Sequence, residues 1–376
     1  MTSIQKLILP LMMATLALGG CRSDDEEVVS STYQDIPVSE SLDFFLLNEG
    51  NMGSNKASLD FCSPSNGYYR KNFYAEENPT VVQELGDVGN DIKIYGNRVY
   101  AVINCSNLVE VFDKYTFKHI GSFSIPNCRY IDFDKQYAYV SSYAGPVAID
   151  PNARLGYVAR VDTASLSVLD TCVVGYQPDE LAIVDGLIYV ANSGGYRVPN
   201  YDNTVSIIDV ETFTVVNTIE VGINLHHCRY DGNGYLWVNS RGDYYDTPAN
   251  LYRINCSTLE IDTLDIEVSD YDICEETLYY YGAIWSYITS SNTVGYGTVN
   301  IHTLAHTETL ITDGTDESIQ VPYGIKVDPV TLDFYVTDAK NYVIPGSLYC
   351  FDKSGTMQWK VTTGDIPAHI TFLNNQ

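Results

Sequence analysis

The 376-residue chain carries 48 acidic and 21 basic residues, which gives a formal net charge of −27. A nucleic-acid-binding protein needs a basic surface, so this charge excludes that class. The 31 tyrosines are instead typical of half-buried strands and of contact surfaces that join apolar area to a hydrogen-bonding tip.

The N-terminus has the features of a bacterial lipoprotein signal. Lys6 precedes an apolar run over residues 7–18, and LGGC at residues 18–21 fits a lipobox. The apolar run is too short for a membrane-spanning helix and is closely followed by charge. We therefore expect a signal peptide over residues 1–20 and lipidation of Cys21. An ordinary cleaved signal with a chance cysteine is the alternative.

The segment after Cys21 is polar and acidic, beginning with RSDDEE at residues 22–27, and shows little apolar periodicity. We predict a flexible acidic tether over residues 21–42. The lipid would be the only anchor of the folded body to the membrane.

From residue 43 onward a motif returns seven times, in which a short apolar strand is closed by a polar residue. The closing residues, spaced by 46 to 50 residues, are Ser63, Asp113, Asp162, Asp209, Asn255, His302 and Asp352. A repeat of this length in a strand-rich chain predicts a propeller, whose repeats bury their apolar faces against their neighbours. We predict an all-β, seven-bladed β-propeller over residues 43–376.

Each repeat is expected to form four antiparallel strands. In the fourth repeat we expect these over residues 179–184, 187–193, 204–209 and 214–221, because aromatic and β-branched residues alternate there. Residues 366–372 resemble a first strand with nothing after it, whereas residues 44–48 resemble a second strand with nothing before it. The C-terminal strand should therefore complete the N-terminal blade and close the ring.

This topology sorts the connections onto two faces. Connections within the first and third hairpins of each blade are short and rich in Gly and Asn, whereas those on the opposite face are long and individual. We expect the long connections to form the working face, where a ligand would be bound by residues of polar and aromatic type. The candidate ligand-binding residues are Asn51, Asp87, Tyr143, Tyr196, Arg197, Tyr201, Arg241, Tyr244, Tyr245, Trp285, Tyr287, Lys340 and Tyr342.

Signals of catalysis or metal binding are weak. His226, His227 and His369 fall near the starts of first strands and could line an axial pocket, as a base, as metal ligands or as structural residues. No GxSxG, HExxH or P-loop motif is present, and the nine cysteines lack zinc-site spacing, so we expect buried thiols. The acidic loop 313–317 lacks the further ligands of an EF-hand, and a solvated loop is expected there. We predict no enzyme activity, no metal and no catalytic cofactor.

Several motifs together carry a resemblance to a known family. They are LNEGNMG (47–53), GDVGND (86–91), YAGP (143–146), DPNARLGYV (150–158), ANSGGYRVPNYDN (191–203) and SRGDYYDTP (240–248). These stretches resemble the surface-exposed cobalamin-binding propeller lipoproteins (BtuG-type) of gut anaerobes.

The resemblance implies a propeller that captures vitamin B12 or related corrinoids outside the cell. It also implies docking on a TonB-dependent outer-membrane transporter, to which the ligand is passed. The acidic run after Cys21 resembles the signal that sends such lipoproteins to the outer leaflet of the outer membrane. An adhesion or scaffold propeller that binds a protein or glycan, and a propeller hydrolase or lyase, remain as alternatives.

Overall fold

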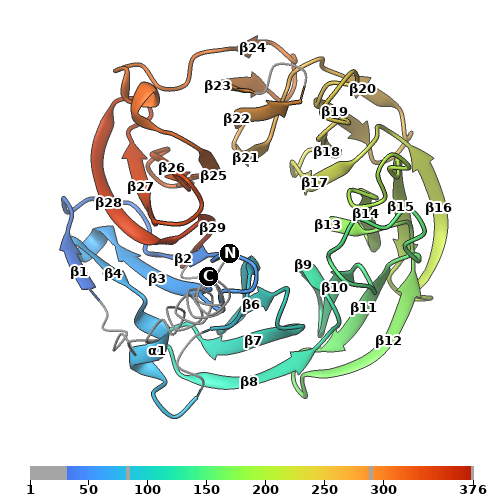
Figure 1. The fold of residues 1–376 in the computed structure, drawn as a ribbon, viewed down its shortest axis with the longest axis horizontal. Helices are drawn as coiled ribbons and strands as arrows, with labels where there is room; N and C mark the ends of the chain where they lie inside the picture. The colour runs from blue at the N-terminus through green and yellow to red at the C-terminus, as the bar shows by residue number, and fades with distance from the viewer. Residues whose placement is uncertain (1–31, 82–84, 288–290, 374–376) are drawn as a thin grey trace, which may run out of the picture. The chain divides into compact units, whose positions relative to one another are not determined.

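The computed structural model describes residues 32–81, 85–287 and 291–373, and the structural statements below concern these residues. Their strands form seven antiparallel sheets around a central axis (Figure 1). This confirms the predicted seven-bladed β-propeller with four strands in a blade. Cys21, the signal peptide and the first half of the predicted tether, up to residue 31, lie outside the described residues.

The blades follow one another along the chain. Blade 1 contains β1 (Thr32–Asp35), β2 (Phe44–Asn48), β3 (Ser58–Ser63), β4 (Tyr68–Lys71) and β29 (Pro367–Phe372). Blades 2 and 3 contain β5 (Gly89–Tyr95), β6 (Arg98–Ile103), β7 (Leu108–Asp113), β8 (His119–Ser124), β9 (Cys128–Asp134), β10 (Tyr137–Ser142), β11 (Tyr157–Asp162) and β12 (Ser167–Val173). Blades 4 and 5 contain β13 (Pro178–Val184), β14 (Leu187–Asn192), β15 (Thr204–Asp209), β16 (Thr214–Glu220), β17 (Leu225–Tyr230), β18 (Tyr235–Ser240), β19 (Asn250–Asn255) and β20 (Ile261–Thr263). Blades 6 and 7 contain β21 (Asp270–Cys274), β22 (Thr277–Ser286), β23 (Ser291–Asn300), β24 (His306–Thr307), β25 (Pro322–Val327), β26 (Phe334–Asp338), β27 (Pro345–Phe351) and β28 (Met357–Asp365). Short helical turns are η1 (Pro64–Asn66), α1 (Phe73–Glu77) and η2 (Thr315–Ser318).

The two ends of the propeller meet in blade 1. The C-terminal β29 pairs antiparallel with β2, with Phe44 opposite Phe372 and Leu46 opposite Ile370. The closure expected from the sequence is therefore present. Blade 1 also has a fifth, outermost strand, β1, which pairs with β4 and lies inside the segment predicted as tether. The predicted tether thus does not stay unstructured up to residue 42. Three of the four residues of β1 are exposed and three are polar, so no apolar alternation marks it.

Seven hydrophobic clusters hold the blades together, each between two neighbouring blades. The second strand of each blade contributes to both of its neighbours because alternate side chains point to opposite faces. In β6, Val99, Ala101 and Ile103 pack toward blade 1, whereas Tyr100 and Val102 pack toward blade 3. Burial on both faces explains the aromatic and β-branched signature of these strands. The eight cysteines in the described residues are free thiols; six of them are buried, as expected, and Cys105 and Cys256 are half-buried.

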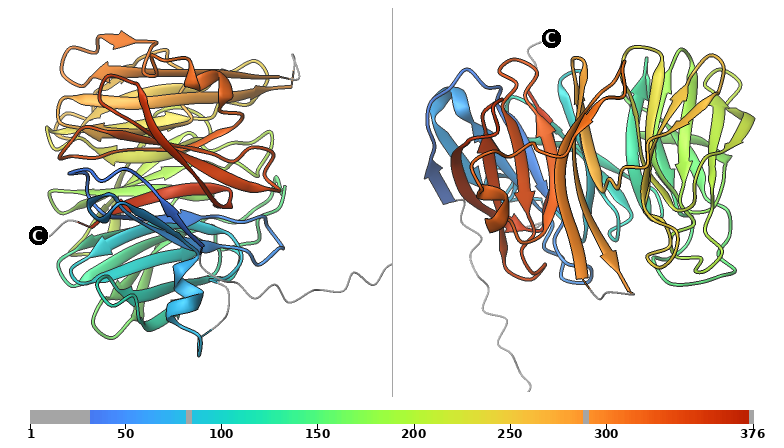
Figure 2. Two further views of the ribbon diagram at one scale, coloured as in Figure 1. Left: turned by 90° about the vertical axis from the view of Figure 1, so that its left-hand side faces the viewer. Right: turned by 90° about the horizontal axis from the view of Figure 1, so that it is seen from above.

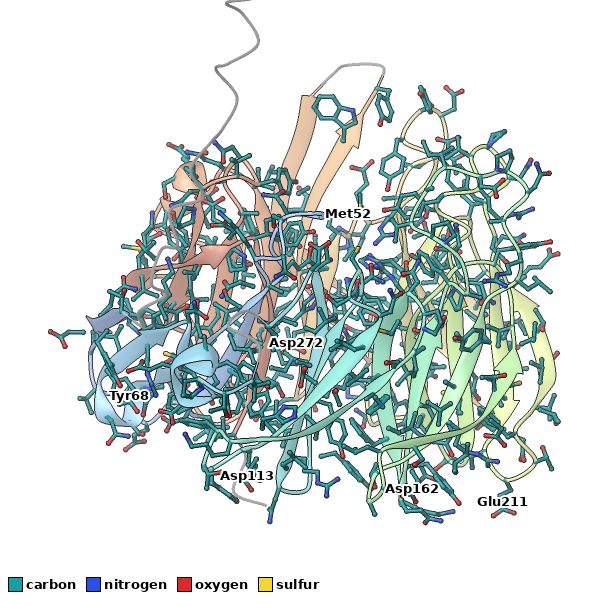
Figure 3. All side chains as sticks on the ribbon, turned by 60° about the horizontal axis from the view of Figure 1, so that its bottom comes forward. Met52, Tyr68, Asp113, Asp162, Glu211 and Asp272 are labelled. Atoms are coloured by element: carbon teal, nitrogen blue, oxygen red, sulfur yellow. The ribbon has the colours of Figure 1, made fainter. Side chains whose placement is uncertain are left out.

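The strand order defines two faces. The upper face carries the connections from the second to the third strand of each blade and from each blade to the next, and the lower face carries the others. Figure 3 shows Met52, from the β2–β3 connection, on the side opposite Asp113, Asp162 and Glu211. In side view the strands of all blades run between these two faces (Figure 2). Not all upper connections are the loops that their length suggests: residues 282–295 are mostly the extension of β22 and β23, each ten residues long.

The lower turns explain the repeating polar residue. The Asp113 carboxylate accepts hydrogen bonds from the backbone of Tyr115 and Thr116 at 3.0 and 2.8 Å, and Asp162, Asp209, Asn255 and Asp352 make the same type of turn. In blade 6 this residue is Asn300, whose side chain accepts from the backbone of His302 and Thr303. The assignment of His302 as the sixth closing residue was therefore wrong by two positions.

Candidate ligand-binding site

A cavity of about 560 Å³ opens on the upper face, around the axis. Its wall contains residues from all seven blades, including Met52 of the β2–β3 connection. The volume lies in the range of small-molecule sites, which combine apolar walls with a few placed polar groups. The arrangement follows from the ring: loops that are far apart in sequence converge where the innermost strands meet.

One wall of the cavity is built on Asp179 of β13, which is fully buried. Its carboxylate accepts hydrogen bonds from Arg129 Nε at 3.0 Å, Arg241 Nη1 at 3.3 Å and Tyr143 Oη at 2.7 Å. The Arg129 guanidinium also lies over the Tyr143 ring, 4.7 Å from its centroid. Burial raises the pKa of Tyr143, so this phenol stays a hydrogen-bond donor at neutral pH. Asp179 thus fixes the guanidinium groups of Arg129 and Arg241 at the cavity wall.

A histidine cluster lies at the bottom of the cavity. His226 Nε2 is 2.8 Å from Tyr130 Oη, and the rings of His226 and His227 are 3.8 Å apart. Burial, and then the charges of Arg241, His227 and Arg129, lower the pKa of His226 well below its usual value, so this imidazole is neutral. His227 lies between Glu180 Oε2 at 2.7 Å and Asp270 Oδ1 at 3.3 Å.

On the opposite wall, Glu49 joins blades 1 and 7. Glu49 Oε1 is 3.2 Å from His369 Nε2, and Tyr323 Oη donates to Glu49 Oε2 at 2.9 Å. Burial alone would lower the pKa of His369, but its hydrogen bond to Glu49 and the carboxylates of Glu49, Asp91 and Asp270 raise the pKa. All three histidines expected at the axis line this cavity.

The upper rim carries a cluster of exposed aromatic rings from blades 5 and 6. Tyr245 stacks on Tyr287 with centroids 5.0 Å apart, and Trp285 and Tyr244 contact Tyr287 edge-on at 6.2 and 6.4 Å. The β18–β19 connection presents these tyrosines by folding back on itself. Gly242 has φ +63° there, and an added Cβ would lie 2.2 Å from the Thr247 carbonyl oxygen. The Asp243 carboxylate then accepts from the backbone of Tyr245 and Thr247, both at 2.9 Å.

The structure brings part of the predicted set together. The residues that line the cavity are Asn51, Tyr196, Arg241, Tyr244, Trp285 and Tyr342. Tyr245 and Tyr287 extend this surface along the rim, and burial and the neighbouring Tyr244 raise the pKa of Tyr201 beside them. Tyr143 lies behind the wall, 6.3 Å from Tyr196, and supports Asp179.

Three predicted residues are engaged by contacts within or between the upper connections, outside the residues that line the cavity. The Asp87 carboxylate accepts from the backbone of Gly53 at 2.9 Å, Arg197 lies 3.5 Å over the Tyr176 ring, and Lys340 Nζ donates to the Pro345 carbonyl at 2.8 Å. These contacts stabilise loop shape. Residue type alone does not show whether a charged side chain contacts a neighbouring part of the protein or faces a ligand.

Glu49, the first residue after β2, lines the cavity and was missed. Four residues on strands were also missed: Arg129, Tyr130 and Tyr323, which line the cavity, and Asp179, which accepts a hydrogen bond from Arg129. Their signal was the position near the start of a first strand, where alternation points side chains into the channel. The same signal had identified the histidines.

A second cavity, of about 710 Å³, opens on the lower face and was not predicted. Three cations in its wall have carboxylate partners: Lys326 with Asp272 at 2.8 Å, Lys93 with Asp132 at 3.5 Å, and Arg229 with Glu180 and Asp270 at 3.1 and 2.9 Å. Asp270 and His369 contribute to both cavities.

Within the described ranges, no group of three or more His, Cys, Asp or Glu side chains is placed to hold a metal ion. A search of the same residues for helices long and apolar enough to cross a bilayer found none.

The fold and this cavity define a seven-bladed propeller with a ligand-sized opening on one face. The chain belongs to the DUF5074 family, described as a domain of unknown function, whose profile matches residues 43–366. No curated protein matches the chain.

Solved structures share the fold at low identity. A quinonprotein alcohol dehydrogenase-like protein from Bacteroides thetaiotaomicron VPI-5482 is 14% identical, with a TM-score of 0.56 over 89% of this chain and 79% of its own. A functionally unknown protein from Desulfotomaculum acetoxidans DSM 771 is 11% identical, with a TM-score of 0.56 over 89% and 99%. The hydrazine synthase of Kuenenia stuttgartiensis is 14% identical, with a TM-score of 0.53 over 70% and 76%. These likenesses show the architecture alone.

Proposed function

We propose that this protein captures cobalamin or a related corrinoid in the upper cavity, without catalysis, and passes it to a TonB-dependent outer-membrane transporter. The observation that carries the proposal is the upper cavity itself, in which aromatic rings and polar groups from all seven blades converge. The sequence resemblance to cobalamin-binding propeller lipoproteins selects this ligand from among those the cavity could hold.

The chemistry of a corrinoid suits such a wall. A corrin is a wide plane with an amide fringe, and each buried amide left without a partner costs about 1–3 kcal/mol. Rings such as Tyr244 and Trp285 offer flat contact area, and Asn51 and Gln320 offer amide partners. A cavity of about 560 Å³ would enclose only part of so large a molecule. The remainder would lie against the rim formed by Tyr245 and Tyr287.

The proposed location is the outer membrane, with the protein facing the cell exterior. The lipobox at residues 18–21 and the acidic run that follows support a lipid anchor on Cys21. Capture outside the cell and transfer to a transporter would follow from this placement.

The test is direct binding. The chain from residue 22 onward lacks the lipid-bearing Cys21 and keeps the whole compact unit of residues 31–376, including β1. It is mixed with cyanocobalamin and passed through a desalting column, and red colour should elute with the protein. Colour that stays entirely with the small-molecule fraction would reject corrinoid capture.

A propeller hydrolase or lyase is the second candidate, because neutral His226, hydrogen-bonded to Tyr130, faces the cavity as a general base would. Turnover of lactone or sugar substrates that disappears in His226→Ala would favour it.

Cobalt coordination is a separate question. A shift in the visible spectrum of aquocobalamin that is lost in His226→Ala or His369→Ala would establish it, whereas both ring nitrogens of His227 already face carboxylates.

A further inference from the structure

The cavity wall built on Asp179 has more cationic donors than carboxylate acceptors. Arg129 and Arg241 share the single Asp179 carboxylate, and each uses one N–H group on it. Four other arginines have carboxylates that they do not share with another arginine. These are Arg70 with Glu76 and Glu77, Arg160 with Asp170, Arg229 with Glu180 and Asp270, and Arg253 with Asp262.

The remaining N–H groups of this pair open on the cavity. Both arginines line it, with side chains 13% and 28% exposed, and no other acceptor within the described residues takes a hydrogen bond from either guanidinium. Tyr143 also donates to Asp179, to the same oxygen as Arg129, so it cannot offset the surplus of donors. Asp179 thus fixes both guanidinium groups, and their remaining N–H groups have no acceptor within the described residues.

The acceptors elsewhere in the cavity are already engaged. Glu49 takes hydrogen bonds from His369 and Tyr323, and Asp270 contacts Arg229 and His227. The cavity is therefore polarised, with surplus donors on the Asp179 wall and occupied acceptors opposite. In a chain with a net charge of −27, a buried cationic wall of this kind is an attractive position for an anionic group.

We infer that Arg129 and Arg241 form an oxyanion subsite that binds a phosphate-type group of the ligand. Planar guanidinium groups offer paired N–H donors that match phosphate and carboxylate oxygens, and such hydrogen bonds are stronger than neutral ones. This inference rests on the proposed function for the identity of the ligand, in which the group is the phosphodiester of the nucleotide arm of cobalamin. The subsite would make the protein prefer complete cobalamin to cobinamide, which keeps the corrin ring and its amides but lacks that arm.

The test compares two ligands and four variants of the chain from residue 22 onward. Isothermal titration calorimetry measures the affinity for cyanocobalamin and dicyanocobinamide in the wild type, Arg241→Gln, Arg241→Lys, Arg129→Gln and Arg253→Gln. Arg241→Gln should weaken cobalamin binding at least tenfold and cobinamide binding less than twofold, because only cobalamin carries the anion. Arg241→Lys should lose less, since it keeps the charge without the planar fork. Arg253→Gln, an arginine paired with Asp262 outside the cavity, is the matched control and should change neither affinity.

The outcomes separate this inference from the proposed function. Equal effects of Arg241→Gln on both corrinoids, or no effect on either, would overturn the subsite while capture itself stands.

If neither corrinoid binds the wild type, capture fails and inorganic phosphate becomes the probe. Thermal unfolding is then measured in potassium phosphate and in potassium chloride at equal ionic strength. Specific stabilisation by phosphate that Arg241→Gln abolishes would support an anion subsite for another ligand, and its absence would overturn it. Arg129→Gln removes the other arginine of the pair. Weaker cobalamin binding by this variant at a native melting temperature excludes loss of fold as the cause.

Discussion

The two ends of the axial channel are built from the same seven innermost strands, yet they differ in how their charges are matched. At the lower opening, Lys93, Lys326 and Arg229 each contact a carboxylate, and the turns around them are short and closed by their own Asp or Asn side chains. At the upper opening, Arg129 and Arg241 share Asp179, and long connections add exposed aromatic rings.

The difference teaches that cavity size is a poor guide to function here. The lower cavity is the larger of the two, about 710 Å³ against about 560 Å³, but its charges satisfy one another. A ligand entering it would have to displace existing ion pairs. The upper cavity offers donors and aromatic surface that the protein itself does not use, so ligand contacts there are gained and not exchanged.

The largest expected effect comes from removing the shared carboxylate. Asp179→Asn keeps the shape of the side chain but replaces an acceptor oxygen with an NH₂ group that faces arginine donors. Leaving buried charges without their partner costs about 3–5 kcal/mol, and we expect a loss of unfolding free energy of that order together with loss of ligand binding. Urea-induced unfolding, followed by tryptophan fluorescence, measures the change.

The matched change at the lower opening is Asp272→Asn. Lys326 is about one-third exposed, so water can replace its partner, and the new amide oxygen can still accept from the backbone of Val327. We expect a loss of about 1–2 kcal/mol. A lower-face variant as damaging as Asp179→Asn would contradict the contrast between the two ends.

The next effect concerns the aromatic rim. Replacing Tyr244 and Tyr245 with Ala should weaken cobalamin binding at least tenfold, about 1.4 kcal/mol, without unfolding the protein. Tyr244 lines the cavity whereas Tyr245 stacks on Tyr287 outside it, so Tyr244→Ala alone should account for most of the loss. Calorimetry with each single variant measures the division. Tyr115→Ala, which removes an exposed tyrosine from a lower turn, is the control, and unchanged affinity in the double variant would exclude this rim from the site.

A smaller effect is a pH dependence of stability that arises from His369 and His226. The folded-state pKa of His369 is raised, so its contribution to stability is complete below about pH 6.5 and is lost as the pH rises through the folded value. The folded-state pKa of His226 is lowered, so its contribution is present above about pH 6.5 and is lost as the pH falls. The Lys and Arg side chains of the lower opening stay charged throughout this range.

The measurement is the stability at pH 5.5 minus that at pH 8.0, obtained from urea unfolding. His369→Gln should make this difference smaller or more negative than in the wild type, and His226→Gln should make it larger. Shifts of the same sign in both variants would contradict the assigned environments.

The architecture was predictable because the blades repeat one physical pattern. Strands β2 and β14 to β16 lie within one residue of their predicted bounds, since buried alternation specifies both their faces and their ends. The upper face was also identified, through the contrast in connection length. Contacts between residues far apart in the sequence were not predicted. Asp179 contacts Arg129 and Arg241 only because the ring brings neighbouring blades together. Lys340 and Arg197, by contrast, are held by local contacts to the Pro345 and Asn200 carbonyls that residue type does not reveal.

The smallest effect tests the lower turns, where Asn300 and not His302 closes blade 6. The structure shows a signal that spacing alone did not resolve: Asp113, Asp162, Asp209 and Asn300 are each followed three positions later by Ser or Thr, whose hydroxyl donates to the same side-chain oxygen. Asn300→Ala removes the acceptor for His302 N–H, Thr303 N–H and the Thr303 hydroxyl, all on an exposed turn where water can partly replace it. A loss of about 0.5–1 kcal/mol is expected. His302→Ala should leave the urea midpoint unchanged, because only the backbone of His302 takes part in the turn. A larger loss for His302→Ala than for Asn300→Ala would restore the original assignment and weaken the view that each lower turn is closed by its own side chain.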